Sequence, residues 1–461
     1  MKPKRWIKRF VPIWRHWVMD SKLTPWHQDE WVERTWGELV ELKYGKALKD
    51  YKDKVTGFPV FGTNGPVGFS ETPLCDFPSV IIGRKGAYRG VHYSEVPFYV
   101  IDTAFYIAPK FDINLKWAYY ELLKQDINGL DSGSAIPSTR REDFYALRVN
   151  VPPRPIQDRI ADLLDSFNNK ITVNRQINQT LEQMAQTLFK SWFVDFDPVI
   201  DNALDAGNAI PDELQARAEQ RQALRNAATQ QGDVSATQAG SAKPLPDNIR
   251  QLFPNEFEES ELGWVPKGWV SSNVGFVSEC FDKHRVPLSK KQRDELKPGI
   301  YPYHGATSIM DYVSEFIFDD IYLLIGEDGS VIKEDGTPYY QYIWGKCWVN
   351  NHAHVLKGKN GVSTEHLMIF MAQANIKAFV TGAVQMKINQ KNMNSIPFLL
   401  ADRKVNEKFS KMILPLYAKF RSNYEQSLEL QILRDTLLPK LISGELRLDE
   451  VESTIKETIT A

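Results

Sequence analysis

The stretch VIIGRKGAY, residues 80–88, recurs in altered form as LLIGEDGSV, residues 323–331, at an offset of 243 positions. The stretches FPVFGTNG at 58–65 and YPYHGATS at 301–308 keep the same offset. Beyond them the offset grows by six residues, and the increase falls in the polar, turn-rich stretch IKEDGTPYY at 332–340, where an insertion costs little. An internal repeat of this kind predicts two copies of one folding unit.

Each copy combines short β-rich runs with one short helical pattern. In the first copy, FYVIDTAFYI at 98–107 is such a run, and LKWAYYELLKQ at 115–125 is the helical pattern. CWVNNHAHVL at 347–356 and TEHLMIFMAQA at 364–374 hold the corresponding places in the second copy. Strand-like runs broken by Gly, Pro and Asn, with a helix after them, predict a mixed α+β module in each half.

A long amphipathic helix is expected to close each half. Apolar residues recur every three or four positions from Ile160 to Leu188, and the same places are filled from Phe409 to Leu437. This is the spacing of a coiled coil. Asn174 and Asn423 are polar residues at matching places, and a buried Asn can fix the register of such a pair. We therefore expect an antiparallel coiled coil with these two amides in contact; two separate surface helices are the alternative.

The predicted fold class is α+β, with two tandem mixed α/β modules separated by two long helices in a pseudo-twofold arrangement. Pro415 lies within the second helix, where it predicts a kink or a late helix start. The segment between the halves is rich in Ala, Gln, Ser and Gly and poor in large apolar residues; its first part is expected as an exposed helix and the rest as a flexible linker. The predicted boundaries are 1–30 for a basic and aromatic leader, 31–152 for the first module, 153–198 for its helix, 199–260 for the linker, 261–402 for the second module, 403–448 for its helix and 449–461 for a tail.

Composition restricts the possible functions. The chain has 461 residues and a formal net charge of −2, so nucleic-acid binding would have to come from local basic patches. Three cysteines without a CxxC pair indicate a reducing compartment, and we expect the cytoplasm. No apolar run is long enough to span a membrane. The basic leader lacks the uninterrupted apolar core of a signal peptide. A surface-membrane helix is the alternative for it, but an extra leader is favoured because nothing downstream suggests a membrane role, so no membrane partner is expected.

Catalytic chemistry is difficult to place in this sequence. Asp195 and Asp197 lie at the end of the first long helix, and we interpret them as an acidic patch that caps the helix or contacts a partner. The acids of IGEDGSVIKEDG at 325–336 have no counterparts in the first copy, which argues against a metal-dependent nuclease. Three residues have the types of a zinc site but no obvious fourth ligand, so a structural or base-facing role is favoured for them: Cys347, His352 and His354. We predict neither a catalytic nor a metal-binding residue.

Basic and amide side chains cluster near the repeated glycine stretches. Arg and Lys can contact phosphates and guanine edges, while Asn and Gln are readers of adenine. Each cluster alone would be read as a solvated surface, but their presence on two tandem modules favours bipartite DNA binding. The predicted DNA-binding residues are Asn64, Arg84, Lys85, Tyr88, Arg89, Ser138, Thr139, Arg140 and Arg141 in the first module, and Lys283, Arg285, His304, Lys387, Asn389, Gln390 and Lys391 in the second.

Three stretches carry a close family resemblance: LFKSWFVDFDPV at 188–199, LFPNEFEESELGWVPKGW at 252–269 and LLPKLISGELRL at 437–448. With the repeated plan, they make residues 31–448 resemble the specificity subunits of Type I restriction–modification systems. The resemblance implies that each module is a target-recognition domain for one half of a split double-stranded DNA site. It also implies that the helices set the gap between the halves, and that the subunit itself is not catalytic.

The resemblance implies partners and cofactors as well. Two methyltransferase subunits would methylate adenines with S-adenosylmethionine, and two restriction–translocase subunits, using ATP and Mg²⁺, would complete the enzyme. No cofactor would be bound by this chain. The apolar end of the first helix is then interpreted as a docking and turning point between the halves. The expected coiled-coil and docking residues are Phe167, Asn174, Leu181, Leu188, Phe189, Trp192, Phe193, Leu416, Asn423, Leu430, Leu437 and Leu441.

Two other classes of function stay open on the sequence. One is a tandem-module scaffold that binds proteins, and the other is a stand-alone DNA-modifying enzyme. A steep dependence of DNA binding on salt would argue against the scaffold, because phosphate neutralisation releases counterions. Methyl transfer by the chain alone would support the enzyme.

Overall fold

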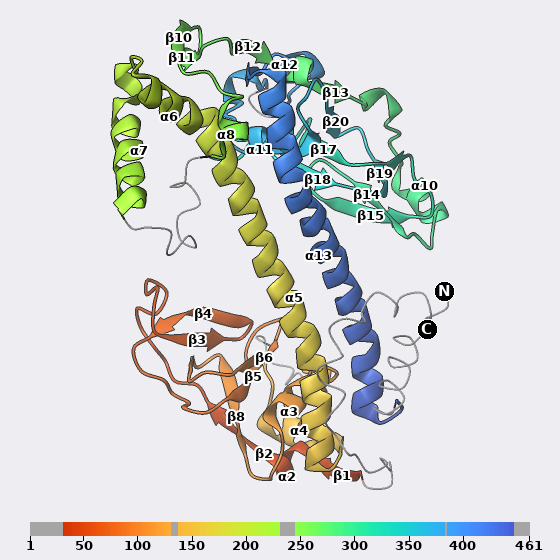
Figure 1. Ribbon diagram of the computed structural model, residues 1–461. Helices are drawn as coiled ribbons and strands as arrows, with labels where there is room; N and C mark the ends of the chain where they lie inside the picture. Colours follow the sequence, from red (N-terminus) through yellow and green to blue (C-terminus); the bar gives the residue numbers. More distant parts are fainter. Residues whose placement is uncertain (1–30, 131–136, 231–244, 383–384, 447–461) are drawn as a thin grey trace, which may run out of the picture. The chain divides into compact units, whose positions relative to one another are not determined.

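The computed structural model describes residues 31–130, 137–230, 245–382 and 385–446. The predicted leader and the whole of the predicted tail lie outside these ranges. The chain divides into two compact units. The first unit combines Met1–Asn174 with Glu425–Ala461, and the second is Arg175–Tyr424. Figure 1 shows the elements of both units along the chain.

The first module contains two sheets and one short strand pair. The sheets have the strand orders β2-β8-β5-β6 and β4-β3-β7, and β1 pairs with β9. The strands are β1 (Val32–Thr35), β2 (Val40–Tyr44), β3 (Phe58–Gly62), β4 (Gly65–Ser70), β5 (Ser79–Gly83), β6 (Val91–Ser94), β7 (Tyr99–Val100), β8 (Ala104–Pro109) and β9 (Arg148–Val151). The helices are α2 (Trp36–Leu39), α3 (Leu115–Leu122) and α4 (Arg141–Ala146).

The second module repeats this plan. Its sheets have the orders β13-β20-β17-β18 and β15-β14-β19-β16, and β12 pairs with β21. The strands are β12 (Val270–Asn273), β13 (Ser278–Cys280), β14 (Tyr301–His304), β15 (Ile309–Val313), β16 (Phe318–Asp319), β17 (Tyr322–Gly326), β18 (Tyr340–Ile343), β19 (Lys346–Val349), β20 (Ala353–Gly358) and β21 (Pro397–Leu400). The helices are α9 (Val274–Val277), α10 (Lys290–Glu295), α11 (Thr364–Met371) and α12 (Gln390–Asn394), with 3₁₀ turns η5 (Asp282–His284) and η6 (Lys377–Phe379).

The topology confirms the predicted α+β repeat. Strand β5 holds the place of β17, and each lies in the interior of its four-stranded sheet. Both strands are buried along their whole length, which explains why their sequences are continuously apolar rather than alternating. The six extra residues of the second copy lie between β17 and β18, as the offset predicted.

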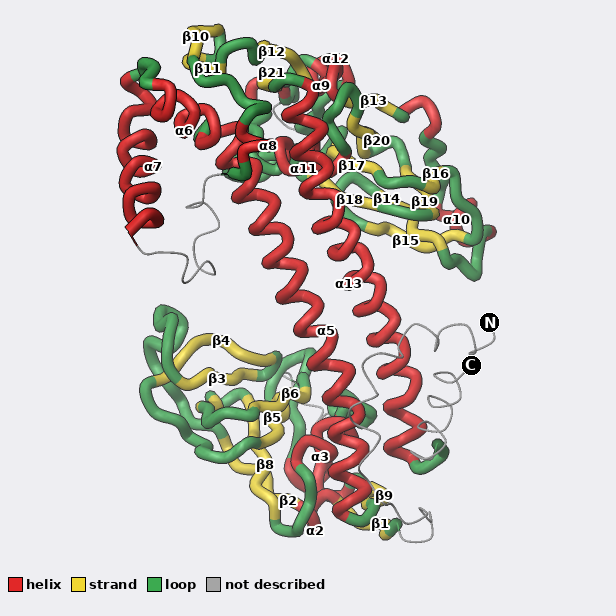
Figure 2. The backbone as a smooth tube through the Cα atoms, viewed as in Figure 1, coloured by secondary structure: helices red, strands yellow, loops and turns green. Residues whose placement is uncertain are grey.

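Both modules continue into long helices, α5 (Arg154–Phe189) and α13 (Arg403–Ser443), which Figure 2 shows in red. Helix α13 passes through Pro415 without interruption, so the predicted late helix start is wrong. Pro415 is exposed, and there water can satisfy the carbonyl group that lacks its N–H partner. The helix therefore tolerates this residue in its interior.

Within the first unit, the polar contacts between α5 and α13 define their direction. The Arg434 guanidinium donates to the side-chain oxygen of Asn168 at 2.7 Å. The Asn174 amide donates to Gln426 Oε1 at 2.9 Å and to Ser427 Oγ at 3.3 Å. Residue numbers rise on one helix as they fall on the other, so the helices run antiparallel in this unit.

The second unit contains the same antiparallel arrangement. The Asn423 amide donates to Asn178 Oδ1 at 2.9 Å, and the rings of Phe189 and Phe409 lie 6.1 Å apart. The predicted antiparallel pairing is therefore confirmed within each unit. A direct contact between Asn174 and Asn423 stays a prediction.

Each unit has its own hydrophobic core, and the long helices belong to these cores. In the first unit, Trp117 of α3 is buried in one cluster with Ile160 of α5 and Leu441 of α13. In the second, Trp192 is buried in one cluster with Phe409 of α13. Burial of this apolar surface is the dominant favourable term for each unit.

Helix α5 ends as the sequence predicted, at a sharp turn. It passes into a π-helical turn, η4 (Lys190–Val194), and α6 (Asp197–Ala206) follows. Phe196 lies between them with a left-handed φ of 54°, which is costly for a bulky residue. Its ring packs against Phe257 and Trp269, at centroid distances of 6.4 and 5.8 Å. This packing offsets the backbone cost and fixes the direction of the turn.

The segment predicted as a linker is largely regular where it is described. It contains α6, α7 (Asp212–Gln230), α8 (Asp247–Arg250) and the hairpin β10 (Phe257–Ser260) with β11 (Gly263–Pro266). Three acid–arginine pairs, each twenty residues apart in sequence, join α6 to α7: Asp197–Arg217, Asp201–Arg221 and Asp205–Arg225. Because ion pairs rather than a wide apolar stripe hold α7, its polar composition concealed the packing.

Candidate functional site

In the first module, four chain segments meet beyond the end of β5. The N–H groups of Arg84 and Lys85 donate to the Thr103 carbonyl at 2.9 and 3.2 Å. The Thr139 N–H donates to the Arg84 carbonyl, and the Gly86 N–H donates to the Pro137 carbonyl, both at 2.9 Å. The Thr63 hydroxyl adds a bond to the Lys85 carbonyl at 2.8 Å. We call residues 62–65, 83–90, 101–103 and 137–141 the first loop cluster.

The second module makes the same backbone bonds at the equivalent positions. The Glu327 N–H donates to the His352 carbonyl at 2.8 Å, and the Ile388 N–H donates to the Glu327 carbonyl at 2.9 Å. The Gly329 N–H donates to the Met386 carbonyl at 3.0 Å. We call residues 304–308, 326–331, 350–352 and 386–391 the second loop cluster. The repeat is therefore preserved at the level of individual hydrogen bonds.

Two aromatic rings lie next to the first loop cluster and contact its arginines. Tyr44 and Phe105 lie on the neighbouring strands β2 and β8, with ring centroids 5.0 Å apart. The guanidinium of Arg141 lies 3.9 Å from the Tyr44 centroid, and that of Arg84 lies 5.0 Å from it. Cation–π attraction of this kind contributes about 0.5–2 kcal/mol, depending on desolvation. Two cations that the sequence assigned to DNA are thus held on a tyrosine ring.

An ionic network takes the same position in the second module. Residues Asp282 and His354 correspond to Tyr44 and Phe105 by strand register. His354, only 1% exposed, directs Nδ1 at the Asp282 carboxylate and Nε2 at the Ile388 carbonyl, 2.9 Å away. Both partners are acceptors, and only the imidazolium form of the ring can donate from both nitrogens. It ties the last segment of the second loop cluster to β20.

Two further residues complete this ionic network. Arg285 pairs with Glu327 at 2.7 Å and with Asp282 at 3.2 Å. Burial raises the pKa of Asp282, but His354, the Val355 N–H and Arg285 outweigh it and leave that pKa below its ordinary value. The second loop cluster is therefore supported by charge where the first is supported by aromatic rings.

The structure divides the predicted DNA-binding residues of the first module into two groups. Asn64, Lys85, Tyr88 and Arg140 are exposed, and Arg84, Ser138 and Arg141 are partly exposed. Arg89 and Thr139 are buried at 3% and 4% exposure. Their assignment to DNA contact is therefore corrected, because neither side chain reaches the surface. All nine residues lie in the first loop cluster.

The second module divides in the same way. Lys283, Lys387, Asn389, Gln390 and Lys391 are exposed. Arg285 lies largely buried in the ionic network, and His304 is only 6% exposed beside Gln341, at 3.1 Å from Nδ1. Burial lowers the pKa of His304 despite the Gln341 contact. Direct DNA contact is therefore corrected for His304. Arg285 is engaged in the ionic network, and its contact with DNA stays a prediction.

Several residues that support the loop clusters were not predicted from the sequence. Tyr44, Phe105, Asp282 and Glu327 were not singled out for this site, although Tyr44 and Asp282 hold equivalent places in the repeat. A comparison of equivalent places beside the glycine stretches could have found them, because a residue of one chemical type in the first copy is replaced there by another type in the second. One further pair lies at the rim, where His352 Nδ1 contacts Asp328 Oδ1 at 2.7 Å.

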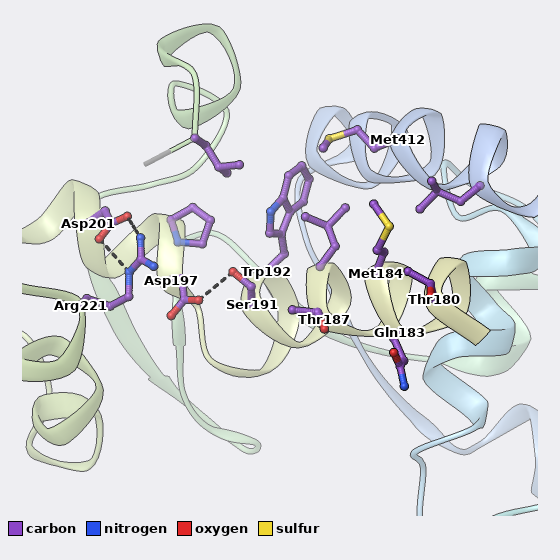
Figure 3. Close-up of a pocket in the computed structure, with 14 residues that line it drawn as sticks. Thr180, Gln183, Met184, Thr187, Ser191, Trp192, Asp197, Asp201, Arg221 and Met412 are labelled. Atoms are coloured by element: carbon purple, nitrogen blue, oxygen red, sulfur yellow. Dashed lines mark hydrogen bonds and ion pairs between the residues drawn. The ribbon is translucent and has the colours of Figure 1, made fainter. Parts of the chain in front are cut away.

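Asp195 and Asp197 lie outside both loop clusters and are engaged in ion pairs. Asp197 is bound by Arg217 at 2.7 Å and accepts a hydrogen bond from Ser191 at 2.7 Å. Asp195 pairs with Lys190 at 2.5 Å. Figure 3 shows Asp197 and the nearby Asp201–Arg221 pair at one end of a cavity of about 480 Å³. These acids join α6 to its surroundings, which agrees with the interpretation as a structural patch.

The structure does not bring together the three residues whose types resemble a zinc site, Cys347, His352 and His354. His352 contacts Asp328, while Cys347 is buried in a separate apolar cluster. His354 instead lies with Cys280 and Asp282, whose potential ligand atoms are within 4.8 Å of one another. Because His354 and Asp282 already bond to each other, the geometry is that of an ion pair.

The predicted coiled-coil and docking residues are mostly covered by the chain itself. Phe189, Trp192 and Phe193 are buried in the core of the second unit, where their rings contact Phe409 of α13. Coverage by the partner helix is therefore confirmed, and docking of another subunit here stays a prediction. Apolar residues that do reach the surface of α5, η4 and α13 are Val173, Met184, Val194, Leu414, Tyr424, Leu428 and Ile432. Except for Met184, none of them belongs to the series of apolar residues, three or four positions apart, from which the paired helices were predicted. Among the described residues, no helix is long and apolar enough to cross a membrane.

Comparison with known proteins agrees with this geometry. The family profile "Type I restriction modification DNA specificity domain" matches residues 28–183 and 266–430, one match for each half. The chain is 23% identical to the Type I restriction enzyme HindI specificity subunit of Haemophilus influenzae, over 71% of this chain and 74% of that protein. It is 22% identical to the MjaIX specificity subunit of Methanocaldococcus jannaschii, over 75% and 72%.

A solved structure supports the fold. The S subunit of a Type I restriction–modification system from M. genitalium superposes with a TM-score of 0.55 at 17% sequence identity, covering 89% of this chain and 96% of that one. At this identity the likeness concerns the fold alone. The two profile matches cover well over half of the chain, and each contains one loop cluster and one stretch of paired helix. The chain therefore belongs to the family of Type I restriction–modification DNA specificity proteins.

Proposed function

We propose that this chain reads a bipartite double-stranded DNA target, with one loop cluster for each half. The observation that carries the proposal is the repeated loop cluster itself. Two modules build the same backbone frame with the same hydrogen bonds, yet they present different exposed side chains. A fixed frame with interchangeable side chains is what recognition of two different half-sequences requires.

The exposed residues of each cluster suit DNA. In the first, Lys85 and Arg140 supply positive charge beside Tyr88. In the second, Lys387 and Lys391 supply charge and Gln390 supplies an amide that can pair with adenine. Since the whole chain carries a net charge of −2, these local cations would provide the attraction to phosphates.

Assembly with catalytic subunits is the second part of the proposal. Two methyltransferase subunits would supply S-adenosylmethionine chemistry, and two restriction–translocase subunits would supply ATP-dependent cleavage with Mg²⁺. This chain would contribute no catalytic residue. The exposed apolar residues of α5, η4 and α13 are the proposed contacts for these subunits, which would cover them on assembly. Three cysteines without disulfide bonds suit the cytoplasm.

Fluorescence anisotropy with the chain assembled on its methyltransferase subunits tests DNA reading. Lys85→Ala and Lys387→Ala should each reduce the slope of log Kd against log salt by about one unit, if each lysine neutralises one phosphate. Lys359→Ala, which removes an exposed lysine that lies outside both clusters and is not among the predicted DNA-binding residues, is the matched control. An unchanged slope in both cluster variants, or no binding of a bipartite duplex by the wild-type complex, would favour the protein scaffold.

The paired helices lead to a separate expectation about spacing. We propose that α5 and α13 fix the gap between the two half-sites. Inserting one heptad into each helix, at facing positions, should lengthen the gap in the methylated motif and leave both halves unchanged. Methylation-sensitive sequencing of host DNA measures this gap. A gap of unchanged length in a folded, active variant would show that the helices do not set the distance between the half-sites.

A further inference from the structure

The loop after β5 presents one aromatic ring to solvent. Tyr88 is 76% exposed, more than any other aromatic residue among the described part of the chain. A single exposed tyrosine is ordinary on a protein surface. Its significance here depends on how firmly the loop is held and on what surrounds it.

The loop that carries Tyr88 is anchored immediately beside it. The buried Arg89 guanidinium donates to the carbonyls of Gly86 at 3.1 Å, Ile127 at 3.3 Å and Asn128 at 2.6 Å. The Arg89 N–H donates to Asn128 Oδ1 at 2.7 Å. Hydrogen bonds to charged groups contribute about 1.5–3 kcal/mol each, so this arginine fixes the backbone from which the ring projects.

Two other contacts close the loop on its opposite side. The Gly90 N–H donates to the Thr63 carbonyl at 3.1 Å. The Asn64 amide, oriented so that both of its polar atoms are satisfied, donates to the Tyr88 carbonyl at 2.5 Å. At Gly83 an added Cβ would lie 2.7 Å from the Thr63 carbonyl oxygen, so the base of the loop is closely packed. The backbone of Tyr88 is therefore bound while its ring is exposed.

The second module has no equivalent ring. Val331 holds the place of Tyr88 in the repeat and is fully buried. The six extra residues that follow it turn the chain back, with a bridge between Ile332 and Pro338. Tyr339, at the place of Gly90, is 37% exposed in the second module, so a ring at the place of Tyr88 itself, and one this exposed, belongs to the first loop cluster.

We propose that Tyr88 stacks on a nucleobase in the first half-site, at a base step that bends or opens when the protein binds. This inference rests on the proposed DNA-reading function and names the role of one residue within it. A ring held by a rigid backbone loses little entropy on contact, and stacking is available on the face of any base. Lys85 and Arg140, exposed in the same cluster, would hold the flanking phosphates.

The assembled complex with a fluorescein-labelled bipartite duplex tests the proposal. Tyr88→Ala should weaken binding about 5- to 150-fold, the range that stacking contacts give on alanine substitution, with no change in salt slope because no charge is lost. Tyr88→Phe should bind within about twofold of the wild type, since the ring is kept. Tyr312→Ala removes an exposed tyrosine of the second module and should bind as the wild type does.

A second readout locates the contact. With 2-aminopurine placed through the first half-site, the wild-type complex should raise the fluorescence at one position, and Tyr88→Ala should abolish that rise. Unchanged affinity of Tyr88→Ala would overturn the proposal, and so would an equal loss in Tyr88→Phe, which would indicate a hydroxyl contact. Failure of the wild-type complex to bind the duplex would instead overturn DNA reading itself.

Discussion

The first and second modules support the same arrangement of loops with side chains of different chemistry. In both, four segments meet through equivalent backbone hydrogen bonds. Beneath them lie Tyr44 and Phe105 in the first module, and Asp282 and His354 in the second. The first pair holds arginines over a ring, and the second pair forms a buried ion pair. The backbone frame is thus compatible with either support, which leaves the exposed residues of each cluster to vary with the DNA sequence that they read.

Removal of the ionic support should have the largest effect. His354→Phe introduces the residue type found at the equivalent position of the first module, Phe105, and removes the imidazole that bonds to Asp282. Breaking a buried ion pair costs about 3–5 kcal/mol. Hydrogen-exchange mass spectrometry should show faster exchange in residues 386–391, while the equivalent residues 137–141 keep the wild-type rate and act as the internal control. Exchange of residues 386–391 at the wild-type rate in the variant would show that the ion pair does not hold the loop.

Acid should weaken this ionic support. The pKa of Asp282 is lowered in the folded chain, so its contribution is present above the unfolded value of about 4 and is lost as the pH falls through the folded value. The difference in protection between the wild type and His354→Phe should therefore shrink below about pH 4. A difference that is constant down to pH 3 would contradict the charged state of this pair.

A second exchange between the modules is expected to give a smaller, pH-dependent effect. His366 is fully buried among Phe189, Phe193 and Phe409, where the first module has Trp117. Burial lowers the pKa of His366 to about 3. Below the unfolded value of about 6.5, the unfolded chain gains a proton that the folded chain does not, so stability falls with pH until the folded value is reached.

This linkage gives a quantitative expectation for one variant. His366→Phe should be more stable than the wild type at pH 5 by about 2 kcal/mol, relative to their difference at pH 7. Hydrogen exchange of residues 364–371 measures it, with residues 115–122 of the first unit as the internal control. The same pH dependence in both proteins would mean that His366 does not titrate in this range.

Removal of one cation from the aromatic support should have the smallest effect. Arg141→Ala removes a guanidinium 3.9 Å from the Tyr44 centroid, which should cost about 1 kcal/mol because this contact is partly exposed. The loss should appear as faster exchange in residues 137–141 and not in residues 386–391. A loss as large as that of His354→Phe would show that the two supports are energetically alike, against the comparison drawn here.

The sequence predicted the repeat, the fold class and the antiparallel helices because periodicity and a constant offset are visible without coordinates. It also located both loop clusters, since glycine stretches and basic residues mark them. It could not show that Arg89 is buried, because its partners Ile127 and Asn128 lie about forty residues away. Helix α7 was expected only as an exposed helix, and its packing was missed because arginines rather than an apolar stripe fix it, as in the buried Arg221–Asp201 pair.

Exchange of a whole module tests the central claim most directly. Residues 31–152 would be replaced by the corresponding module of a family member with another specificity, and the methylated motif of host DNA would then be sequenced. If each loop cluster reads one half-site, only one half of the motif should change, while the other half and the gap stay as in the wild type. A change in both halves, or in neither, would contradict the account.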